Sequence, residues 1–226
     1  AEDPPACSFD AGALPADTLP SGTPHGAQIP IDHVVVLMQE NRSFDHYLAR
    51  LHSKDVDRAP RNATNPDPQG GAPVRAHRDR RYCEVADLSH SWNGTHRSWN
   101  GGAMDGFTGA NVDAADPSGA RAMAYYTAND LGFYFDLYST FAIGDRHFCS
   151  VLGPTYPNRH YLLAATSFGH IRNDFPGAAT EFSQRTIFNA LDEAGVSWKV
   201  YQAQAAFALL YAYVRNERIA NVVPLS

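Results

Sequence analysis

A change of hydrophobic period between residues 34 and 51 constrains the fold more than any other feature of this chain. Val34–Met38 is an apolar run, β-branched at its start, which is typical of a strand buried on both faces. The spacing then becomes helical, because apolar residues recur at Phe44, Tyr47, Leu48 and Leu51. The sequence therefore predicts a buried strand followed directly by an amphipathic helix.

Three polar residues, Gln39, Glu40 and Asn41, stand where the predicted strand ends and the helix begins. In open α/β sheets, ligands bind at the carboxyl ends of the strands. The carboxylate of Glu40 and the amide oxygen of Asn41 are hard oxygen donors suited to a divalent cation. The plainer interpretation is that Asn41 caps the helix and Glu40 is a solvated loop charge.

Composition limits the classes of partner. The 226-residue chain has a formal net charge of −6, which argues against a nucleic-acid partner held by bulk electrostatics. No apolar run approaches the roughly 20 residues needed to cross a bilayer, so any lipid contact would be a peripheral membrane contact. The length and the 44% hydrophobic fraction allow one large α/β domain with a sizeable core.

The first residues and the cysteines indicate the compartment. Residues 1–28 are rich in Pro, Gly, Ala and Thr, as at the mature start of an exported protein whose signal peptide has been removed. We therefore expect an extended segment over residues 1–30 and a secreted or periplasmic location. Cys7, Cys83 and Cys149 fit an oxidising compartment, and one disulfide plus one remaining thiol is the simplest expectation, with the pairing left open.

The polar stretch 54–81 is dense in Pro, Asn, Asp and Arg, which predicts a surface excursion without regular structure. We expect residues 31–226 to form the N-terminal part of a single α/β domain. In that domain, an inserted loop region would occupy about residues 54–118.

The segment 87–102 concentrates side chains suited to a phosphate ester. Its imidazoles, His90 and His96, and the amide of Asn93 can donate to phosphate oxygens. Its indoles, Trp92 and Trp99, can wall a pocket or face a cationic group. The alternative is a stiff loop whose aromatic side chains fill the core and whose polar groups bond the backbone.

A second candidate region lies at residues 149–161. Pro157 suits the first turn of a helix that continues past Tyr161. Thr155 would then stand just before the helix N-terminus, where unpaired amides and the helix dipole favour an anion. A hydroxyl placed there can serve as a nucleophile if a metal lowers its pKa. The simpler interpretation is that Thr155 only caps the helix.

The remaining pattern alternates helices with short strands. Helices are expected from about Ser118 to Tyr126 behind Asp116–Pro117, after a cap at Asn129 or Asp130, over Thr186–Ala194, and over most of Ala203–Ile219. The second of these has a stripe that we expect in the core: Leu131, Tyr134, Phe135 and Tyr138. Strands are expected at Phe141–Ile143 and Val196–Tyr201. This alternation favours a mostly parallel sheet sandwiched by helices.

Three motifs carry a resemblance to a known family. Residues 38–47, Met-Gln-Glu-Asn-Arg-Ser-Phe-Asp-His-Tyr, resemble the opening signature of the bacterial phosphoesterase family. This family contains phospholipases C and a related acid phosphatase within the alkaline phosphatase superfamily. Residues 90–96 resemble its His-x-Trp-Asn-Gly-x-His block, and residues 153–159 resemble the Gly-Pro-Thr-x-Pro-Asn-Arg block that carries the nucleophile. Leu48-Ala49 departs from the aromatic-Gly that the family usually has there.

The resemblance implies an alkaline-phosphatase-like fold, incomplete in this chain, and a role for each matching residue. Glu40, Asn41 and Thr155 would hold a divalent metal ion, zinc or calcium, and Thr155 would attack phosphorus. The other catalytic residues would be His90, His96 and Asn158. The substrate-binding residues would be Trp92, Asn93, Trp99 and Arg159.

Family members continue for roughly as many residues again, and that second half carries an acidic pair and a His. We therefore expect the C-terminal remainder of the same protein to be a partner that supplies further metal ligands. The leading hypothesis is a metal-dependent phospholipase C that cleaves phosphocholine-type lipids through a phospho-threonine intermediate. The alternatives are an acid phosphatase of the same family and a non-catalytic phosphate- or lipid-binding fragment.

Overall fold

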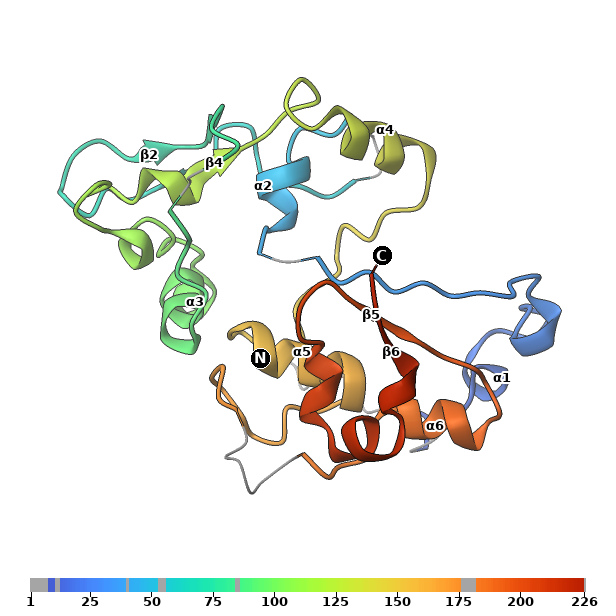
Figure 1. Ribbon diagram of the computed structural model, residues 1–226. Helices are drawn as coiled ribbons and strands as arrows, with labels where there is room; N and C mark the ends of the chain where they lie inside the picture. The colour runs from blue at the N-terminus through green and yellow to red at the C-terminus, as the bar shows by residue number, and fades with distance from the viewer. Residues whose placement is uncertain are drawn as a thin grey trace. The chain divides into compact units, whose positions relative to one another are not determined.

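The computed structural model describes residues 8–10, 13–39, 41–52, 56–83, 86–175 and 182–225 (Figure 1). The chain consists of two compact units, residues 1–40 and residues 41–226. The second unit contains two hydrophobic cores. Every residue predicted for the site is described and belongs to this second unit, except Glu40, which lies outside the described residues.

The first unit has little regular structure. Its described residues form one helical turn, α1 Pro15–Thr18, and one 3₁₀ turn, η1 Gly26–Gln28. The buried strand predicted at residues 34–38 is wrong, because this stretch is irregular and Val34 and Val35 are 82% and 89% exposed. A strand buried on both faces needs hydrogen-bonded neighbours. None of the described strands pairs with this stretch.

The helix predicted after this stretch is confirmed. It is α2, Phe44–Leu48, and it begins after Ser43, whose hydroxyl accepts a hydrogen bond from the amide of His46 at 3.3 Å. Ser43 is therefore the N-cap, which leaves the side chain of Asn41 available for another contact.

The first core joins α2 to α4, Gly132–Thr140. Its buried residues are Leu48, Leu51 and Phe135, and the partly buried residues around them are Phe44, Tyr47, Val56, Leu131, Tyr138 and Ile143. The apolar face predicted for α2 and the aromatic stripe predicted for α4 are therefore both part of the core. Each large apolar side chain buried in this way contributes about 1.5–3 kcal/mol.

The predicted cap of α4 is wrong. Leu131 occupies the N-cap position and makes no side-chain cap bond. The carboxylate of Asp130 instead accepts hydrogen bonds at 2.8 Å from Arg78 Nε and from the Tyr82 hydroxyl. The bond from Arg78 holds the pKa of Asp130 well below its ordinary value. A carboxylate with an arginine partner is thus drawn away from the helix end.

The strands among the described residues are short and form three separate two-stranded sheets. The pairs are β1 Thr64–Asn65 with β2 Val74–Arg75, antiparallel, and two parallel pairs, β3 His77–Arg78 with β4 Ala124–Tyr125 and β5 Val200–Gln202 with β6 Val222–Pro224. The chain is mixed α/β, as expected, but the described residues form no large parallel sheet. Alternating patterns indicate where extended segments occur, not how many neighbours each one finds.

Two strand predictions need correction for the same reason. Residues 141–143 are irregular, and Phe141 is 68% exposed. The strand predicted over 196–201 is confined to β5, which begins at Val200 and gains a partner only in β6.

The inserted region near 54–118 has more regular structure than its composition predicts. It contains β1, β2, β3, α3 Trp92–Trp99, η2 Asn100–Gly102 and η3 Gly109–Asn111. The side chain of Asn65, which is only 3% exposed, organises part of it. Asn65 Oδ1 accepts from the amide of Phe107 at 2.9 Å, and Asn65 Nδ2 donates to the carbonyl of Met104 at 3.1 Å. A satisfied buried amide thus fixes a polar region that has few apolar residues.

The helix predicted over 118–126 is reduced to a 3₁₀ turn, η4 Ala120–Met123, followed by β4. The N-cap position is Gly119 and not the predicted Asp116, although the carboxylate of Asp116 accepts from the amides of Ala120 and Arg121, each at 3.0 Å. The turn ends early because the chain continues as β4 beside β3.

The C-terminal part of the second unit is built on the second core. Its helices and turns are α5 Thr155–Ala164, α6 Ile187–Glu193, η5 Phe207–Leu210, the π turn η6 Tyr213–Glu217 and η7 Ile219–Asn221. Its buried residues are Phe182, Phe188, Ala208, Tyr211 and Val214. The helix predicted at 186–194 is confirmed as α6, which Gly195 follows at φ +67°. The region 203–219 is divided into short turns instead of one helix.

The described cysteines, Cys83 and Cys149, are exposed and unbonded, so they do not form the expected disulfide with each other. Cys7 lies outside the described residues. In the part of the chain that the structure describes, no helix has the length and apolar character needed to cross a membrane.

Candidate functional site

The side chain of Asn41 connects the opening motif to the His- and Trp-rich segment. Asn41 Nδ2 donates to Asp87 Oδ1 at 2.5 Å across 46 positions of sequence. This bond uses the amide nitrogen of Asn41. It leaves Asn41 Oδ1 as the atom that could coordinate a metal ion. Asp87 therefore sets which atom of Asn41 is presented to a ligand.

The same Asp87 lies beside His90. His90 Nδ1 is 2.8 Å from the carbonyl oxygen of Leu88 and 3.4 Å from Asp87 Oδ2. A carbonyl oxygen can only accept, so we assign the ring proton to Nδ1. Neutral His90 then offers the lone pair of Nε2, and protonated His90 offers a second N–H donor.

Helix α3 begins at Trp92, two residues after His90. The hydroxyl of Ser91 caps it and accepts from the amide of Gly94 at 3.1 Å. A Cβ added to Gly94 would lie 2.0 Å from Ser89 Oγ, so this position needs glycine for the close approach. The first turn of α3 thus contains Trp92, Asn93 and Gly94. Trp92 and Asn93 therefore lie close in the chain to His90.

Thr155 is the first residue of α5, as the sequence predicted to within one position. Asn158, one turn later, fixes the approach to this helix start. Its Nδ2 lies 3.1–3.2 Å from the carbonyl oxygens of Val151, Gly153 and Pro154, and its Oδ1 accepts from the amide of Val151 at 3.2 Å. The amide of Asn158 is therefore engaged with the backbone, which gives this residue a positioning role at the helix start.

The loop before Thr155 contacts α3 directly. Thr95 Oγ1 lies 2.8 Å from the carbonyl oxygen of Leu152, within hydrogen-bond distance. A Cβ added to Gly153 would lie 3.5 Å from Trp92 Cε3, so the indole lies against this loop. These contacts bring together two motifs that are about 60 residues apart in the sequence.

A cavity of about 590 Å³ opens where the two motifs meet. Its lining residues are 88–93, Pro154 and 171–173, and we call it the site cavity. It includes three predicted site residues, His90, Trp92 and Asn93. Thr155 follows the lining residue Pro154 directly.

Six described site residues are not among the lining residues: Asn41, Thr155 and Asn158, whose positions are given above, and His96, Trp99 and Arg159. His96 Nδ1 is 2.7 Å from the carbonyl oxygen of Trp92, and the rings of His96 and Trp92 are tilted by 32° with centroids 4.2 Å apart. Trp99, at the end of α3, is 42% exposed. The guanidinium of Arg159 lies over the ring of Phe207, 5.8 Å from its centroid. The roles predicted for these residues therefore remain predictions.

Three residues around the site were not predicted from the sequence: Asp87, Arg172 and Asn173. Asp87 orients Asn41 and His90, and its position three residues before His90 is a signal that could have indicated it. Arg172 and Asn173 line the site cavity, and Asn173 Oδ1 accepts from the amide of Tyr156 in the first turn of α5 at 2.8 Å. No sequence motif marks these two residues, because the loop after α5 brings them there.

The donor set suits a hard cation in kind but not in number. The Asn41 amide oxygen and the Thr155 hydroxyl are oxygen donors of the right chemistry. Among the described residues, no group of three or more His, Cys, Asp or Glu side chains could hold a metal ion. Glu40 lies outside those residues, so the metal site is not defined by the described part of the chain alone.

One buried histidine lies on the same helix as Thr155. His160 is 1% exposed, and its Nδ1 is 2.7 Å from the hydroxyl of Tyr211. Burial lowers the pKa of His160 to about 4 and raises the pKa of the Tyr211 hydroxyl. His160 is therefore neutral at physiological pH and belongs to the aromatic packing of the second core.

An imidazole, an indole and an amide line one cavity, and a hydroxyl at a helix start follows its lining residue Pro154 directly. These groups are suited to a phosphate ester. Residues 31–223 match the model of the phosphoesterase family, and the chain belongs to this family.

Individual relatives give a finer comparison. The chain is 36% identical over 239 residues to phospholipase C B of Mycobacterium tuberculosis, an alignment that covers 93% of this chain and 46% of the relative. It is 39% identical over 215 residues to phospholipase C A of the same organism, covering 84% of this chain and 41% of the relative. It is 32% identical to non-specific phospholipase C4 of Arabidopsis thaliana, covering 83% and 38%. The chain thus spans less than half the length of the curated relatives it matches.

Proposed function

We propose that this chain carries the nucleophile and headgroup-binding part of a metal-dependent phospholipase C that acts on phosphocholine-type phosphodiesters. The observation that supports this proposal most strongly is the shared cavity. His90, Trp92 and Asn93 line it together with Pro154, and the contact of Thr95 with Leu152 joins their two segments. The named relatives, which are phospholipases C, support the same choice.

In this proposal, a divalent metal ion would be held by Glu40, Asn41 and Thr155. When bound, the ion would supply positive charge beside the phosphate group. Because the described residues provide too few ligands, we propose that residues outside this chain, acidic groups and a His among them, complete the set. The length of the relatives leaves room for such a remainder.

The reaction then proceeds on the hydroxyl of Thr155. Thr155 Oγ attacks phosphorus, the bond from phosphorus to the glycerol oxygen breaks, and the headgroup stays on Thr155 as a phosphothreonine ester. The Thr155 hydroxyl gives up one proton and the departing alkoxide takes one up. Water next attacks the same phosphorus and releases Thr155 with the phosphorylated headgroup.

The residues around the cavity support these steps. With its proton on Nδ1, His90 offers Nε2 to accept a proton or, when protonated, to donate to a phosphoryl oxygen. The indole of Trp92 provides a face for the quaternary ammonium of choline, and Asn93 provides amide donors. Asn158 acts through the backbone by holding the segment that positions Thr155.

Substitution of Thr155 tests the nucleophile. We expect Thr155→Ala to lose turnover of p-nitrophenyl phosphorylcholine, whereas Thr155→Ser keeps part of it, since both hydroxyls can attack phosphorus. Thr140→Ala is the matched control, because Thr140 is an exposed threonine at the end of α4. Full activity of Thr155→Ala would show that Thr155 is not the nucleophile and serves only as the first residue of α5.

The substrate class has a separate test. p-Nitrophenyl phosphorylcholine should be cleaved faster than p-nitrophenyl phosphate. The reverse preference would make the protein an acid phosphatase of the same family, and no metal-dependent turnover of either compound would favour a non-catalytic phosphate- or lipid-binding module.

A further inference from the structure

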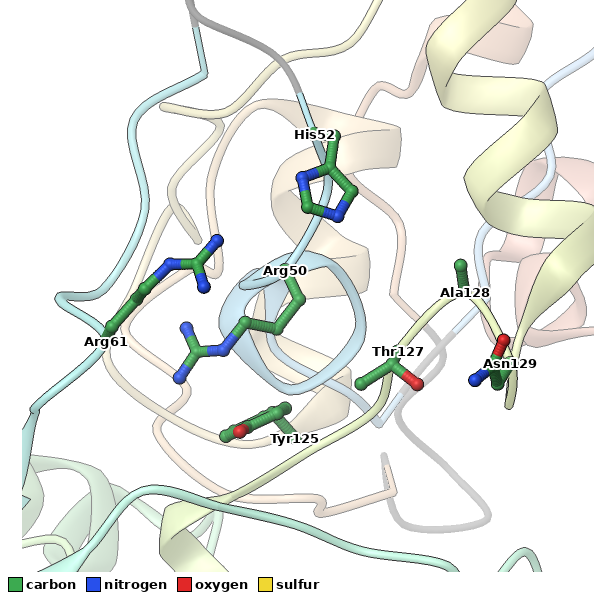
Figure 2. Close-up of a pocket in the computed structure, with 7 residues that line it drawn as sticks. All are labelled: Arg50, His52, Arg61, Tyr125, Thr127, Ala128 and Asn129. Carbon is green, nitrogen blue, oxygen red and sulfur yellow. The ribbon is translucent and has the colours of Figure 1, made fainter.

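A second cavity, of about 330 Å³, lies at the C-terminal end of α2 and shares no lining residue with the site cavity. Its lining residues are Arg50, His52 and Arg61, with residue 125 and residues 127–129 on the opposite side. We call it the basic pocket. Figure 2 shows the two guanidinium groups and the imidazole turned toward the same space.

Arg50 is held in place by an aromatic ring and a backbone carbonyl. Its Cζ lies 4.0 Å from the centroid of the Tyr125 ring, and its Nη1 donates to the carbonyl of Ala49 at 3.1 Å. The neighbouring residues Ala49 and Leu51 are 3% and 1% exposed, so the backbone that carries Arg50 is fixed. A guanidinium has five N–H donors, and most of those of Arg50 remain available to a ligand.

The positive charge of the pocket is not neutralised by its described neighbours. Among the described residues, neither Arg50 nor Arg61 forms an ion pair, whereas Arg78, Arg121 and Arg218 each pair with an aspartate. No Asp or Glu is among the lining residues that the structure describes. Residues 53–55, which follow His52, lie outside the described residues.

The nearest carboxylate in sequence on the opposite side is already engaged. Asp130 follows the lining residue Asn129, but it pairs with Arg78 and accepts from the amide and hydroxyl of Thr127 at 2.8 and 2.7 Å. Its charge is therefore balanced before any ligand enters. In a chain with a net charge of −6, two unpaired guanidinium groups beside an imidazole form a local positive site.

We propose that the basic pocket binds a phosphate-type oxyanion. Two guanidinium groups can grip such an anion with paired N–H donors. The volume of about 330 Å³ corresponds to roughly ten waters at about 30 Å³ each, which is more than one bare phosphate needs. The pocket therefore has room for a phosphate ester, whether a soluble ester or the headgroup of an anionic phospholipid.

The test compares Arg61→Gln with Arg75→Gln in the otherwise unchanged protein. Arg61 and Arg75 are both exposed, and Arg75 lies on β2 outside the pocket. Binding is measured with inorganic phosphate, with glycerol phosphate, and with phosphatidylcholine vesicles that do or do not contain phosphatidylglycerol. We expect Arg61→Gln to weaken binding by about ten-fold and Arg75→Gln to leave it unchanged. Turnover of p-nitrophenyl phosphorylcholine should be the same in both variants.

The three probes identify the source of the oxyanion. Arg61-dependent binding of phosphate or glycerol phosphate indicates a soluble ligand, and Arg61-dependent binding of the anionic vesicles indicates a lipid headgroup. Either result supports the proposal. Equal binding by Arg61→Gln and Arg75→Gln, or phosphate binding that is lost only in Thr155→Ala, would overturn it.

Chemical modification gives a second test that needs no variant. Phenylglyoxal reacts with accessible arginines, and the modified peptides are quantified by mass spectrometry. Glycerol phosphate should protect Arg50 and Arg61 several-fold and should not protect Arg75. If glycerol phosphate leaves the extent of modification unchanged at each of the three arginines, the proposal is contradicted.

Discussion

The site cavity and the basic pocket use polar side chains in different ways. In the site cavity, polar groups are already bonded to protein: Asn173 to a helix amide, His90 to a carbonyl, and the neighbouring Asn158 to three carbonyls. In the basic pocket, Arg50 bonds one carbonyl and Arg61 has no ion-pair partner among the described residues. Apart from Arg172, the first cavity is lined by neutral groups, several of them fixed by the backbone, whereas the basic pocket brings two arginines together without an ion-pair partner among the described residues.

This difference matches two different tasks. Groups held by the backbone keep their positions while charge develops on a substrate, which is what catalysis requires. Two neighbouring cations repel each other, and a bound anion relieves this repulsion. Such a pocket is suited to reversible anion binding. The comparison therefore predicts that the site cavity depends on orientation and that the basic pocket depends on charge.

The largest expected effect tests the dependence on orientation. In Asn158→Asp, a carboxylate would replace the amide donor that faces three carbonyl oxygens at 3.1–3.2 Å. We expect a loss of roughly 2–4 kcal/mol in the free energy of unfolding, measured by urea titration. Asn62→Asp, at an exposed position, is the control and should change little. Equal midpoints for the two variants would break the comparison.

The next effect tests the shared role of Asp87. Asp87→Ala removes the acceptor for Asn41 Nδ2 and the carboxylate beside His90. We expect about a ten-fold lower kcat with little change in KM, because positioning is lost and binding surface is not. The control is Asp105→Ala, since Asp105 is also exposed and accepts a hydrogen bond from an asparagine, Asn100. A change confined to KM would show that Asp87 acts on substrate binding instead.

A pH experiment tests the contribution of the buried histidines to stability. Burial lowers the pKa of His46 and of His160 to about 4, from an ordinary value of 6.5. The unfolded chain then binds more protons than the folded chain, so this stability is complete above pH 6.5 and is lost as pH falls toward 4. We expect a loss of roughly 1–3 kcal/mol over that range.

The measurement is the free energy of unfolding at several pH values. The pH dependence should become shallower in His46→Gln and should be unchanged in His33→Gln, because His33 is exposed. A parallel pH dependence in all three proteins would show that carboxylates alone control acid stability.

The smallest effect compares the two indoles of α3. Trp92 lines the site cavity and Trp99 does not. Trp92→Ala should lower kcat/KM for p-nitrophenyl phosphorylcholine by roughly 2- to 30-fold, the range of a cation–π contact, and Trp99→Ala should do less. If Trp99→Ala has the larger effect, the headgroup lies outside the cavity described above.

The local elements were predictable where a pattern carries its own physics. The apolar face of α2, the aromatic stripe of α4 and the start of α5 at Thr155 all follow from helical spacing and from proline in a first turn. The pairing of distant segments was not. Residues 34–38 have the composition of a buried strand but lack a partner among the described strands, and composition cannot supply one.

The candidate site shows the same limit. The sequence predicted His90, Trp92 and Thr155 from their chemistry and from a family resemblance. It did not predict Asn173, which reaches the first turn of α5 through tertiary structure, or the competition for Asp130 that removes it as a helix cap. The roles of these side chains depend on tertiary contacts, which no local sequence pattern specifies.

The central claim is that Thr155 becomes covalently attached to the phosphorus of the substrate. The most direct test is to mix the protein with p-nitrophenyl phosphorylcholine, quench with acid within one turnover, and locate any adduct by peptide mass spectrometry. We expect a phosphocholine group on Thr155 that appears with the first released p-nitrophenolate and is absent from Thr155→Ala. Turnover with no adduct at any quench time, or an adduct on another residue, would contradict it.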